Sequence, residues 1–224
     1  MKQNEIACCD FVTSARDNQP KPLTGSLLKE LIESQPVAVL NQRVRQHNEA
    51  SEAYKLRLPA VTWQSEFNGK MRKDINASPT GFFCLDVDIH HEPEYIDIWN
   101  HHGREAALHW AEQEAKERAQ RWAKMQQEED SGMRKGEPLQ IVAIHVSPSG
   151  TGVHVVAMCN ETCPTIAANQ KRLARLLDTS YDEVCKDWAR IFFIVPRRDW
   201  TYIDWRALFY DDIEQNEEEE NEEE

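Results

Sequence analysis

The chain of 224 residues is long enough for one substantial hydrophobic core, and we expect a single domain. Hydrophobic residues make up 40% of it and charged residues 29%, with no run of about 18 apolar residues and no signal-type apolar block at the N-terminus. This composition excludes a membrane-spanning protein and indicates a cytoplasmic protein with no membrane partner.

The formal net charge of −13 depends largely on residues 211–224. This segment holds ten of the 39 acidic residues and no basic residue, and the other 29 acidic residues nearly balance the 26 Lys and Arg. We therefore predict a disordered acidic tail at 211–224. The acidic total does not argue against a nucleic-acid partner for the rest of the chain.

The N-terminal part, residues 1–54, is predicted to be a helical segment that packs on the core. In "TGSLLKELIESQ", residues 24–35, Thr and Ser capping residues precede leucines and an isoleucine at helical spacing. A second helix is expected over 37–48. We expect both helices to be structural.

Two strands and a basic loop follow. The alternation in "LPAVTWQSEF" predicts a strand over 58–67, and the apolar run in "TGFFCLDVDIHH" predicts another over 80–91. The loop between them carries Lys70, Arg72 and Lys73. These residues are candidates for contacts to a DNA backbone, and an ordinary basic surface loop is the alternative.

A long polar helix is predicted over 103–130. Its apolar residues form a narrow stripe at steps of three and four, which is typical of a helix that docks by one face: Leu108, Ala111, Ala115, Ala119 and Trp122. Gly and Pro then end the helix. We interpret 103–135 as a helical insertion in a domain that spans 55–210.

A hairpin, a helix and a last strand complete the predicted fold. Apolar strands at 139–146 and 152–158 flank the Gly-containing turn "SPSGTG", and a helix over 165–178 precedes a strand over 190–196. The polar side of that helix carries three further candidates for DNA contacts, Lys171, Arg172 and Arg175. The order of elements indicates an α/β (α+β) fold with a mixed or antiparallel sheet flanked by helices.

Two aspartates lie inside the apolar strand at 80–91. Residues two apart on a strand share a face, so Asp86 and Asp88 point one way while Leu85 and Val87 point the other. Two neighbouring carboxylates repel each other unless a cation lies between them, and oxygen ligands favour Mg²⁺ or Mn²⁺. The alternative is an exposed strand face with two solvated acids.

The hairpin turn offers a second candidate site. Ser147, Ser149, Gly150 and Gly152 form a tight turn whose hydroxyl and N–H groups suit phosphate oxygens, and His154 follows on the outgoing strand. An ordinary turn with a core histidine is the alternative. Three other histidines are interpreted as structural or surface residues: His90, His91 and His145.

A third acid would complete a two-metal site of the kind used for phosphoryl transfer. Asp178, Asp182 and Asp187 all follow the helix at 165–178, and the residues leave the choice among them open. Arg190, at the start of the last strand, is a candidate for neutralising a triphosphate.

In this order, these features resemble the VirE N-terminal domain family, which itself resembles archaeo-eukaryotic primases and primase-polymerases. The resemblance covers residues 55–205. The acid-x-acid motif matches Asp86 and Asp88, and an apolar residue followed by Asp best matches Asp178, with Asp187 as a competitor. The Ser-Gly-x-Gly-x-His pattern matches Ser149, Gly150, Gly152 and His154.

The resemblance implies a primase-polymerase-like core with an RRM-like sheet. It also implies a DNA primase/polymerase-like nucleotidyltransferase of a mobile element or phage. Asp86, Asp88 and Asp178 would then hold two Mg²⁺ or Mn²⁺ ions, and the Ser-Gly turn, His154 and Arg190 would bind the nucleotide. The implied partners are single-stranded DNA template, nucleoside triphosphates and a replicative helicase.

Two alternatives remain open. A catalytically inactive module with the same fold would bind DNA and assist replication or transfer. A metal-dependent nuclease is suggested by His90 and His91 beside the acids, although no His-x-His ligand unit accompanies them.

Overall fold

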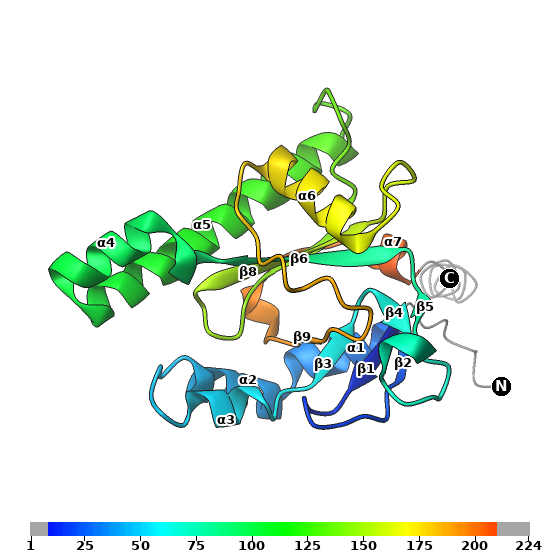
Figure 1. The fold of residues 1–224 in the computed structure, drawn as a ribbon, viewed down its shortest axis with the longest axis horizontal. Helices are drawn as coiled ribbons and strands as arrows, with labels where there is room; N and C mark the ends of the chain where they lie inside the picture. The colour runs from blue at the N-terminus through cyan, green and yellow to red at the C-terminus, as the bar shows by residue number, and fades with distance from the viewer. Residues whose placement is uncertain (1–8, 210–224) are drawn as a thin grey trace, which may run out of the picture.

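The computed structural model describes residues 9–209, and within this range the chain forms seven α-helices and three antiparallel sheets, none of which closes on itself. The predicted α+β class is confirmed. A central sheet lies between helices on one side and the N-terminal elements on the other (Figure 1). The predicted acidic tail lies outside the described residues.

The central sheet contains the strand with the two aspartates. Its order is β10 (Trp200–Ile203), β7 (Ile141–Val146), β8 (Gly152–Met158) and β6 (Phe82–Asp88). The register of β6 with β8 pairs Asp86 with His154 and Asp88 with Gly152. The hairpin predicted from the sequence is therefore confirmed, and it brings the two candidate motifs side by side.

Both faces of β6 meet hydrophobic side chains. Phe83, Leu85 and Val87 belong to a cluster under the helices, whereas Cys84 belongs to a second cluster on the N-terminal side. Strand parity places Asp86 on the same side as Cys84, and the predicted two-faced strand is confirmed. The carboxylates therefore lie at the end of the face that the N-terminal elements cover.

Three helices lie on the other side of the sheet: α4 (Pro93–His102), α5 (Arg104–Asp130) and α6 (Ile166–Leu177). The helix predicted as an insertion is α5, and it packs directly on β7 and β8. Its contact face is a row of buried alanines, which lets the helix approach the sheet closely: Ala107, Ala111, Ala115, Ala119 and Ala123. Leu108, expected in this stripe, is only half-buried because Ala107 takes that position.

Enlarging one of these alanines is expected to destabilise the fold. Ala115 is fully buried against the sheet, so Ala115→Leu adds volume where none is free and should lower the free energy of unfolding by about 1–3 kcal/mol. Urea denaturation measures the change. Gln120→Leu, on the exposed side of the same helix, serves as the control and should change stability little. Equal effects of the two substitutions would contradict the close packing of α5.

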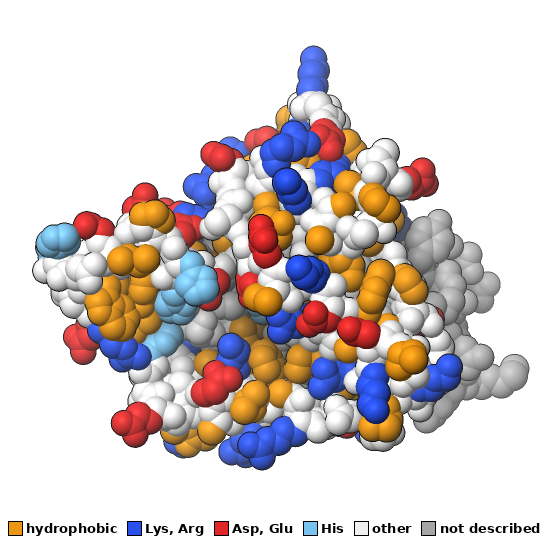
Figure 2. All heavy atoms as spheres, viewed as in Figure 1, with side chains coloured by type: hydrophobic (Ala, Val, Ile, Leu, Met, Phe, Trp, Pro, Cys, Tyr) orange, Lys and Arg blue, Asp and Glu red, His pale blue; other side chains and the backbone are white. Residues whose placement is uncertain are grey.

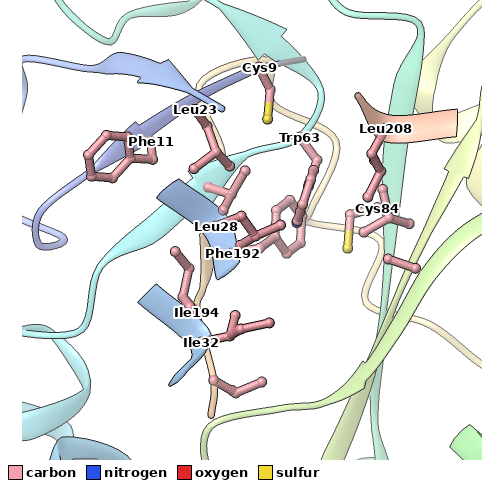
Figure 3. Packing of buried hydrophobic residues seen from close by; sticks show 14 of the residues in the cluster. Cys9, Phe11, Leu23, Leu28, Ile32, Trp63, Cys84, Phe192, Ile194 and Leu208 are labelled. Carbon is pink, nitrogen blue, oxygen red and sulfur yellow. The ribbon is translucent and has the colours of Figure 1, made fainter. Parts of the chain in front are cut away.

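The N-terminal elements form a second layer around another sheet. This sheet has the order β2 (Lys21–Leu23), β1 (Cys9–Val12), β3 (Ala60–Thr62) and β9 (Phe192–Phe193). Three helices accompany it: α1 (Gly25–Glu33), α2 (Gln35–Val44) and α3 (Ser51–Lys55). The first two begin where Thr24 and Ser34 accept hydrogen bonds from Leu27 N and Val37 N, so the capping prediction is confirmed. Figure 3 shows how Leu28, Trp63 and Phe192 of this layer meet Cys84 of the central sheet.

Several predicted boundaries differ from the structure. The strand expected over 58–67 is divided, since β3 ends at Thr62 and a turn separates it from β4 (Ser65–Glu66), which pairs with β5 (Ser78–Pro79). The strand expected over 190–196 is limited to β9. The expectation of a helical segment over 1–54 is wrong in part, because strands β1 and β2 precede α1 and form a sheet with β3. Strand β5, helices α3 and α4, strand β10 and the short helix α7 (Trp205–Leu208) were also not predicted. Within residues 9–209, no helix is both long enough and apolar enough to cross a membrane.

Candidate functional site

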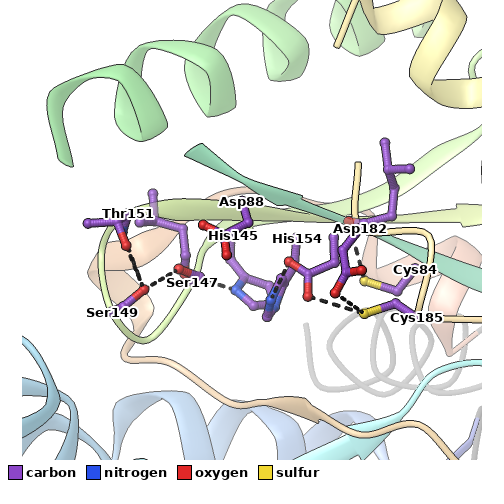
Figure 4. Close-up of polar contacts among 12 residues, drawn as sticks. Cys84, Asp88, His145, Ser147, Ser149, Thr151, His154, Asp182 and Cys185 are labelled. Atoms are coloured by element: carbon purple, nitrogen blue, oxygen red, sulfur yellow. Dashed lines mark hydrogen bonds and ion pairs between the residues drawn. The ribbon is translucent and has the colours of Figure 1, made fainter. Parts of the chain in front are cut away.

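A cleft of about 560 Å³ opens where the ends of β6 and β8 face α2, α3 and the segment before β9. Figure 4 shows the polar side chains that β6, the hairpin turn and the 182–185 segment direct toward it. The carboxyl, imidazole, hydroxyl and thiol groups that line it come from Asp86, Asp88, Asp182, His90, His154, Ser147, Ser149 and Cys185, and from Glu52, His47 and Ser51 of the N-terminal layer. The cleft therefore brings together the acid pair, the serine turn and His154, as the sequence predicted.

Asp86 is held by contacts from three directions. Its Oδ1 lies 3.4 Å from His154 Nε2, its Oδ2 accepts a hydrogen bond of 3.4 Å from Cys185 Sγ, and its backbone carbonyl accepts one of 2.8 Å from Asp182 N. Burial acts to raise the pKa of Asp86, but His154, the hydrogen bond from Cys185 and the charge of Lys55 together outweigh it, so the pKa lies below its usual value. Asp86 is thus an ionised acid in a confined position.

Asp182 and Cys185 complete a group with metal-ligand geometry. Donor atoms of Asp86, Asp182 and Cys185 all lie within 4.8 Å of one another. The Cys185 thiol also donates to Asp182 Oδ2 at 3.5 Å, and burial together with Asp86 raises its pKa well above the usual value. Two carboxylates at this spacing suit a divalent ion, and the Cys185 thiol lies within hydrogen-bond distance of both.

Asp88 joins the serine turn through a chain of hydrogen bonds. Its Oδ1 lies 2.8 Å from His90 Nδ1 and accepts the backbone N–H of His90 at 3.1 Å. His90 Nδ1 is 3.5 Å from Thr151 Oγ1, which is 2.9 Å from Ser149 Oγ, and that is 3.0 Å from Ser147 Oγ. The interpretation of His90 as a surface residue is wrong, because the turn after β6 directs it into the cleft. His91 is exposed, as expected.

Burial acts to raise the pKa of Asp88, but hydrogen bonds from the ring and backbone of His90 outweigh it, so the pKa lies below its usual value. Asp88 is therefore a second ionised acid on the same strand face. The side chains of Asp86 and Asp88 are 26% and 39% exposed, which leaves both accessible from the cleft.

The glycine at the start of β8 is required by close packing. A Cβ at Gly152 would lie 2.7 Å from the carbonyl oxygen of Val87. The N–H groups of Ser147 and Gly150 are already used within the hairpin, bonding to Gly152 O and Ser147 O. The turn therefore presents hydroxyl groups to the cleft. Fewer of its backbone N–H groups are free for phosphate oxygens than the sequence analysis predicted.

His154 is held edge-on to a second histidine. The rings of His145 and His154 lie 4.8 Å apart at 82°, and Trp200 packs on the other side of His145 at 4.4 Å. Burial, with a smaller contribution from His154, lowers the pKa of His145 to about 3, so this ring is neutral at physiological pH. The structural interpretation of His145 is thus confirmed, and its ring fixes His154 toward Asp86.

Cations from three parts of the chain line the cleft. Lys55, Arg104 and Arg190 come from α3, the start of α5 and the segment before β9. Within residues 9–209, Lys55 and Arg190 form no ion pair, and the buried Nε of Arg190 has no hydrogen-bond partner. An unpaired buried guanidinium N–H is costly, so this side of the cleft suits an anionic ligand.

Three predicted site residues do not line the cleft. Asp178 is the exposed C-cap of α6 in the left-handed conformation, and Asp187 is exposed, so neither lies with Asp86. Asp182 is the acid of this segment that does. Gly150 faces Arg45 and Glu112, whose side chains would each lie 3.4 Å from a Cβ at this position, so other side chains enclose it.

The predicted DNA contacts are corrected in part. Arg72 donates to the backbone carbonyls of Ala189 and Ala15, at 2.9 and 3.2 Å, and so holds loops together. Arg172 and Arg175 both bind Glu137, and Arg172 is buried. The other three candidates, Lys70, Lys73 and Lys171, are exposed and lie outside the cleft.

Several residues that line the cleft were not predicted from the sequence, among them Lys55, Cys185, His90 and Arg104. Lys55 comes from a segment interpreted as structural, and nothing in its local pattern distinguishes it from a surface lysine. Cys185 follows Asp182 in a D-x-x-C arrangement, and that spacing is a signal that sequence reasoning had available.

No protein-family model matches this chain, and neither a curated protein nor a solved structure shows significant similarity to it. The fold and the geometry of the cleft therefore carry the functional argument.

Proposed function

We propose that this protein is a metal-dependent nucleotidyltransferase of the DNA primase/polymerase-like class. The observation that carries the proposal is the register of β6 with β8, which places Asp86 opposite His154 and Asp88 opposite Gly152. Acids suited to divalent ions therefore share one cleft with a serine turn and with unpaired cations. A nucleoside triphosphate is a ligand that needs both kinds of group.

The chain order supports a primase-polymerase-like core. With α4 and β9 as additional elements, strand β6, helix α5, the β7–β8 hairpin, α6 and β10 follow the β-α-β-β-α-β order of ferredoxin-like sheets. An RRM-like sheet pairs the fourth strand with the first, whereas β10 pairs with β7. Because β10 does not pair with β6, the outer edge of β6 stays open. Asp182 N donates to Asp86 O at this edge, which brings the Asp182 carboxyl beside Asp86.

The donor groups fit Mg²⁺ or Mn²⁺. Asp86, Asp88 and Asp182 would hold the ions, with Asp182 taking the role that the sequence motif assigns to Asp178. When bound, such ions lower the pKa of a hydroxyl nucleophile and neutralise charge on a leaving pyrophosphate. Lys55 and Arg190 would contact the phosphate oxygens, and His154 would hold Asp86 in place.

In the proposed reaction, the 3′-hydroxyl oxygen of a primer attacks the α-phosphorus of the triphosphate. A phosphodiester bond forms, the bond to the β-phosphate oxygen breaks, and pyrophosphate leaves while the hydroxyl proton passes to water. The test is incorporation of labelled nucleotides on primed and unprimed single-stranded DNA with Mn²⁺ or Mg²⁺. Wild-type protein that extends no strand with either ion, while it binds nucleotide, contradicts the proposal.

Removing a cleft cation should weaken triphosphate binding. We expect Lys55→Gln and Arg190→Gln each to raise the Kd for a nucleoside triphosphate about 10-fold, since a charge-assisted hydrogen bond contributes roughly 1.5–3 kcal/mol. Calorimetry with Ca²⁺ in place of Mg²⁺ measures binding without turnover. Lys124→Gln, at an exposed position on α5, is the control. The same loss for a monophosphate would show that the cations do not face the β- and γ-phosphates.

One observation favours an inactive DNA-binding module instead. The Cys185 thiol lies 3.4 Å from Asp86 Oδ2 and 3.5 Å from Asp182 Oδ2, so its one proton can be shared between these two acids. Electron paramagnetic resonance of added Mn²⁺ discriminates the two functions. A DNA-binding protein that leaves all Mn²⁺ free favours the module.

A further inference from the structure

A row of aromatic rings leads out of the cleft along the start of α4. The rings of His90 and Tyr95 lie 5.0 Å apart at 87°, and those of Tyr95 and Trp99 lie 5.8 Å apart at 52°. His90 lines the cleft, and Tyr95 is buried with 6% of its surface exposed. Trp99 is 42% exposed, so the row begins beside Asp88 and ends at the surface.

The exposed end of this row lies outside the hydrophobic clusters of the described residues. Tyr95 and Trp99 are four residues apart and share a helix face, but only Tyr95 reaches the hydrophobic cluster under the helices. Ile96, on the next position of α4, is 50% exposed. Figure 2 shows hydrophobic and histidine side chains gathered at the end of the molecule that α4 and the start of α5 form.

We propose that Trp99 and Ile96 form a stacking surface for bases of a single-stranded nucleic acid that enters the cleft. The inference deepens the proposed function and rests on it for the direction of the strand. Aromatic side chains bind single strands without sequence preference because every base offers a flat face. Tyr95 is buried, so its ring supports Trp99 from inside, and the same row of ring contacts reaches His90 in the cleft, where the strand would be used.

An exposed cation at the start of α5 suits this occupant. Arg104 lines the same cleft, and its Nη2 donates to the backbone carbonyl of His47, which leaves its other guanidinium N–H groups for a phosphate. Asp97 Oδ1 on α4 lies 3.2 Å from His101 Nδ1, and Glu94 and Glu105 are further exposed acids of α4 and α5, so the affinity for a strand must come from stacking and from Arg104. A stable protein interface buries roughly 800 Å² on each partner. Two large apolar side chains offer much less area than that. A single strand is therefore favoured over a protein.

The test is the affinity for a fluorescent oligo-dT, measured by anisotropy in EDTA, so that no nucleotide chemistry is involved. We expect Trp99→Ala to raise the Kd about 5- to 100-fold, the range for loss of one stacked base, and Trp99→Phe to change it little. Met133→Ala, 70% exposed beyond the other end of α5, is the control and should have no effect. An oligonucleotide with abasic sites should bind wild type and Trp99→Ala equally.

Several results would overturn the proposal. One is equal affinity of wild type and Trp99→Ala for oligo-dT, and another is a wild type that binds no oligonucleotide. The third is self-association of wild type in sedimentation that Trp99→Ala abolishes while DNA affinity is unchanged. Failure of the proposed function is seen separately. If wild type incorporates no nucleotide but the Trp99-dependent affinity remains, the stacking surface stands and the enzyme assignment fails.

Discussion

Replacement of Asp86 with asparagine is expected to lower metal-dependent nucleotide incorporation by at least about 10²–10³-fold, the loss typical of one group that stabilises transition-state charge. Asparagine keeps the shape of the side chain and can still contact His154 and Cys185, so the fold should persist. It removes the negative charge that a divalent ion requires. Steady-state incorporation on primed DNA, with circular dichroism for the fold, measures the effect.

The same assay identifies the third acid. Asp182 lies beside Asp86, so Asp182→Asn should reduce incorporation to a similar extent, and the Mn²⁺ dissociation constant should rise with it. Asp178→Asn and Asp187→Asn are matched controls from the same segment, since both acids are exposed and outside the cleft. Activity lost in Asp178→Asn but kept in Asp182→Asn would contradict this arrangement of acids.

Strand parity made the acid pair predictable from sequence. In "FFCLDVD" the alternation alone places Asp86 and Asp88 together, and the short turn fixes the hairpin that brings His154 to them. These are local rules, which depend on neighbours in the chain. The core face of β6 was predictable for the same reason.

The third acid depended on a contact that no local rule gives. Asp178 fits an apolar-Asp pattern, but it caps α6 on the helix side of the sheet and lies outside the cleft. The chain must continue to Asp182 before its backbone N–H reaches Asp86 O. Likewise, the sequence alone made Arg172 a candidate for a DNA contact. In the structure it binds Glu137, which lies 35 positions earlier in the chain. Pairing over such separations is decided by the fold.

Helix α4 and Lys55 were missed for a related reason. The segment "PEYIDIWNHH" has a weak apolar pattern because part of its face is left exposed, and Lys55 resembles any surface lysine. Only packing of the N-terminal layer on the central sheet makes Lys55 part of the cleft. Residues that act between layers leave little trace in the sequence of either layer.

Replacement of Arg45 with alanine is expected to lower the free energy of unfolding by about 3–5 kcal/mol, the usual cost of leaving one member of a buried ion pair alone. Arg45 Nη2 lies 3.0 Å from Asp199 Oδ1, and Asp199 is buried, so its charge would lose its partner. Arg45 Nε also donates to Pro148 O at 3.4 Å, and Asn41 donates to the same carbonyl at 3.1 Å. These bonds join α2 to the serine turn across the two layers.

Urea denaturation measures the loss, and an exposed ion pair provides the control. Lys124 and Glu128 lie 3.9 Å apart with Lys124 77% exposed, so Lys124→Ala should change stability by less than about 1 kcal/mol. Arg45→Met combined with Asp199→Leu should recover most of the loss, because apolar side chains can replace both charges without leaving one unpaired. If Arg45→Ala lowers the free energy of unfolding no more than Lys124→Ala does, the Arg45–Asp199 pair does not join the layers.

The serine turn lies at this junction. Arg45→Ala should therefore also weaken triphosphate binding at urea concentrations at which the protein is still folded.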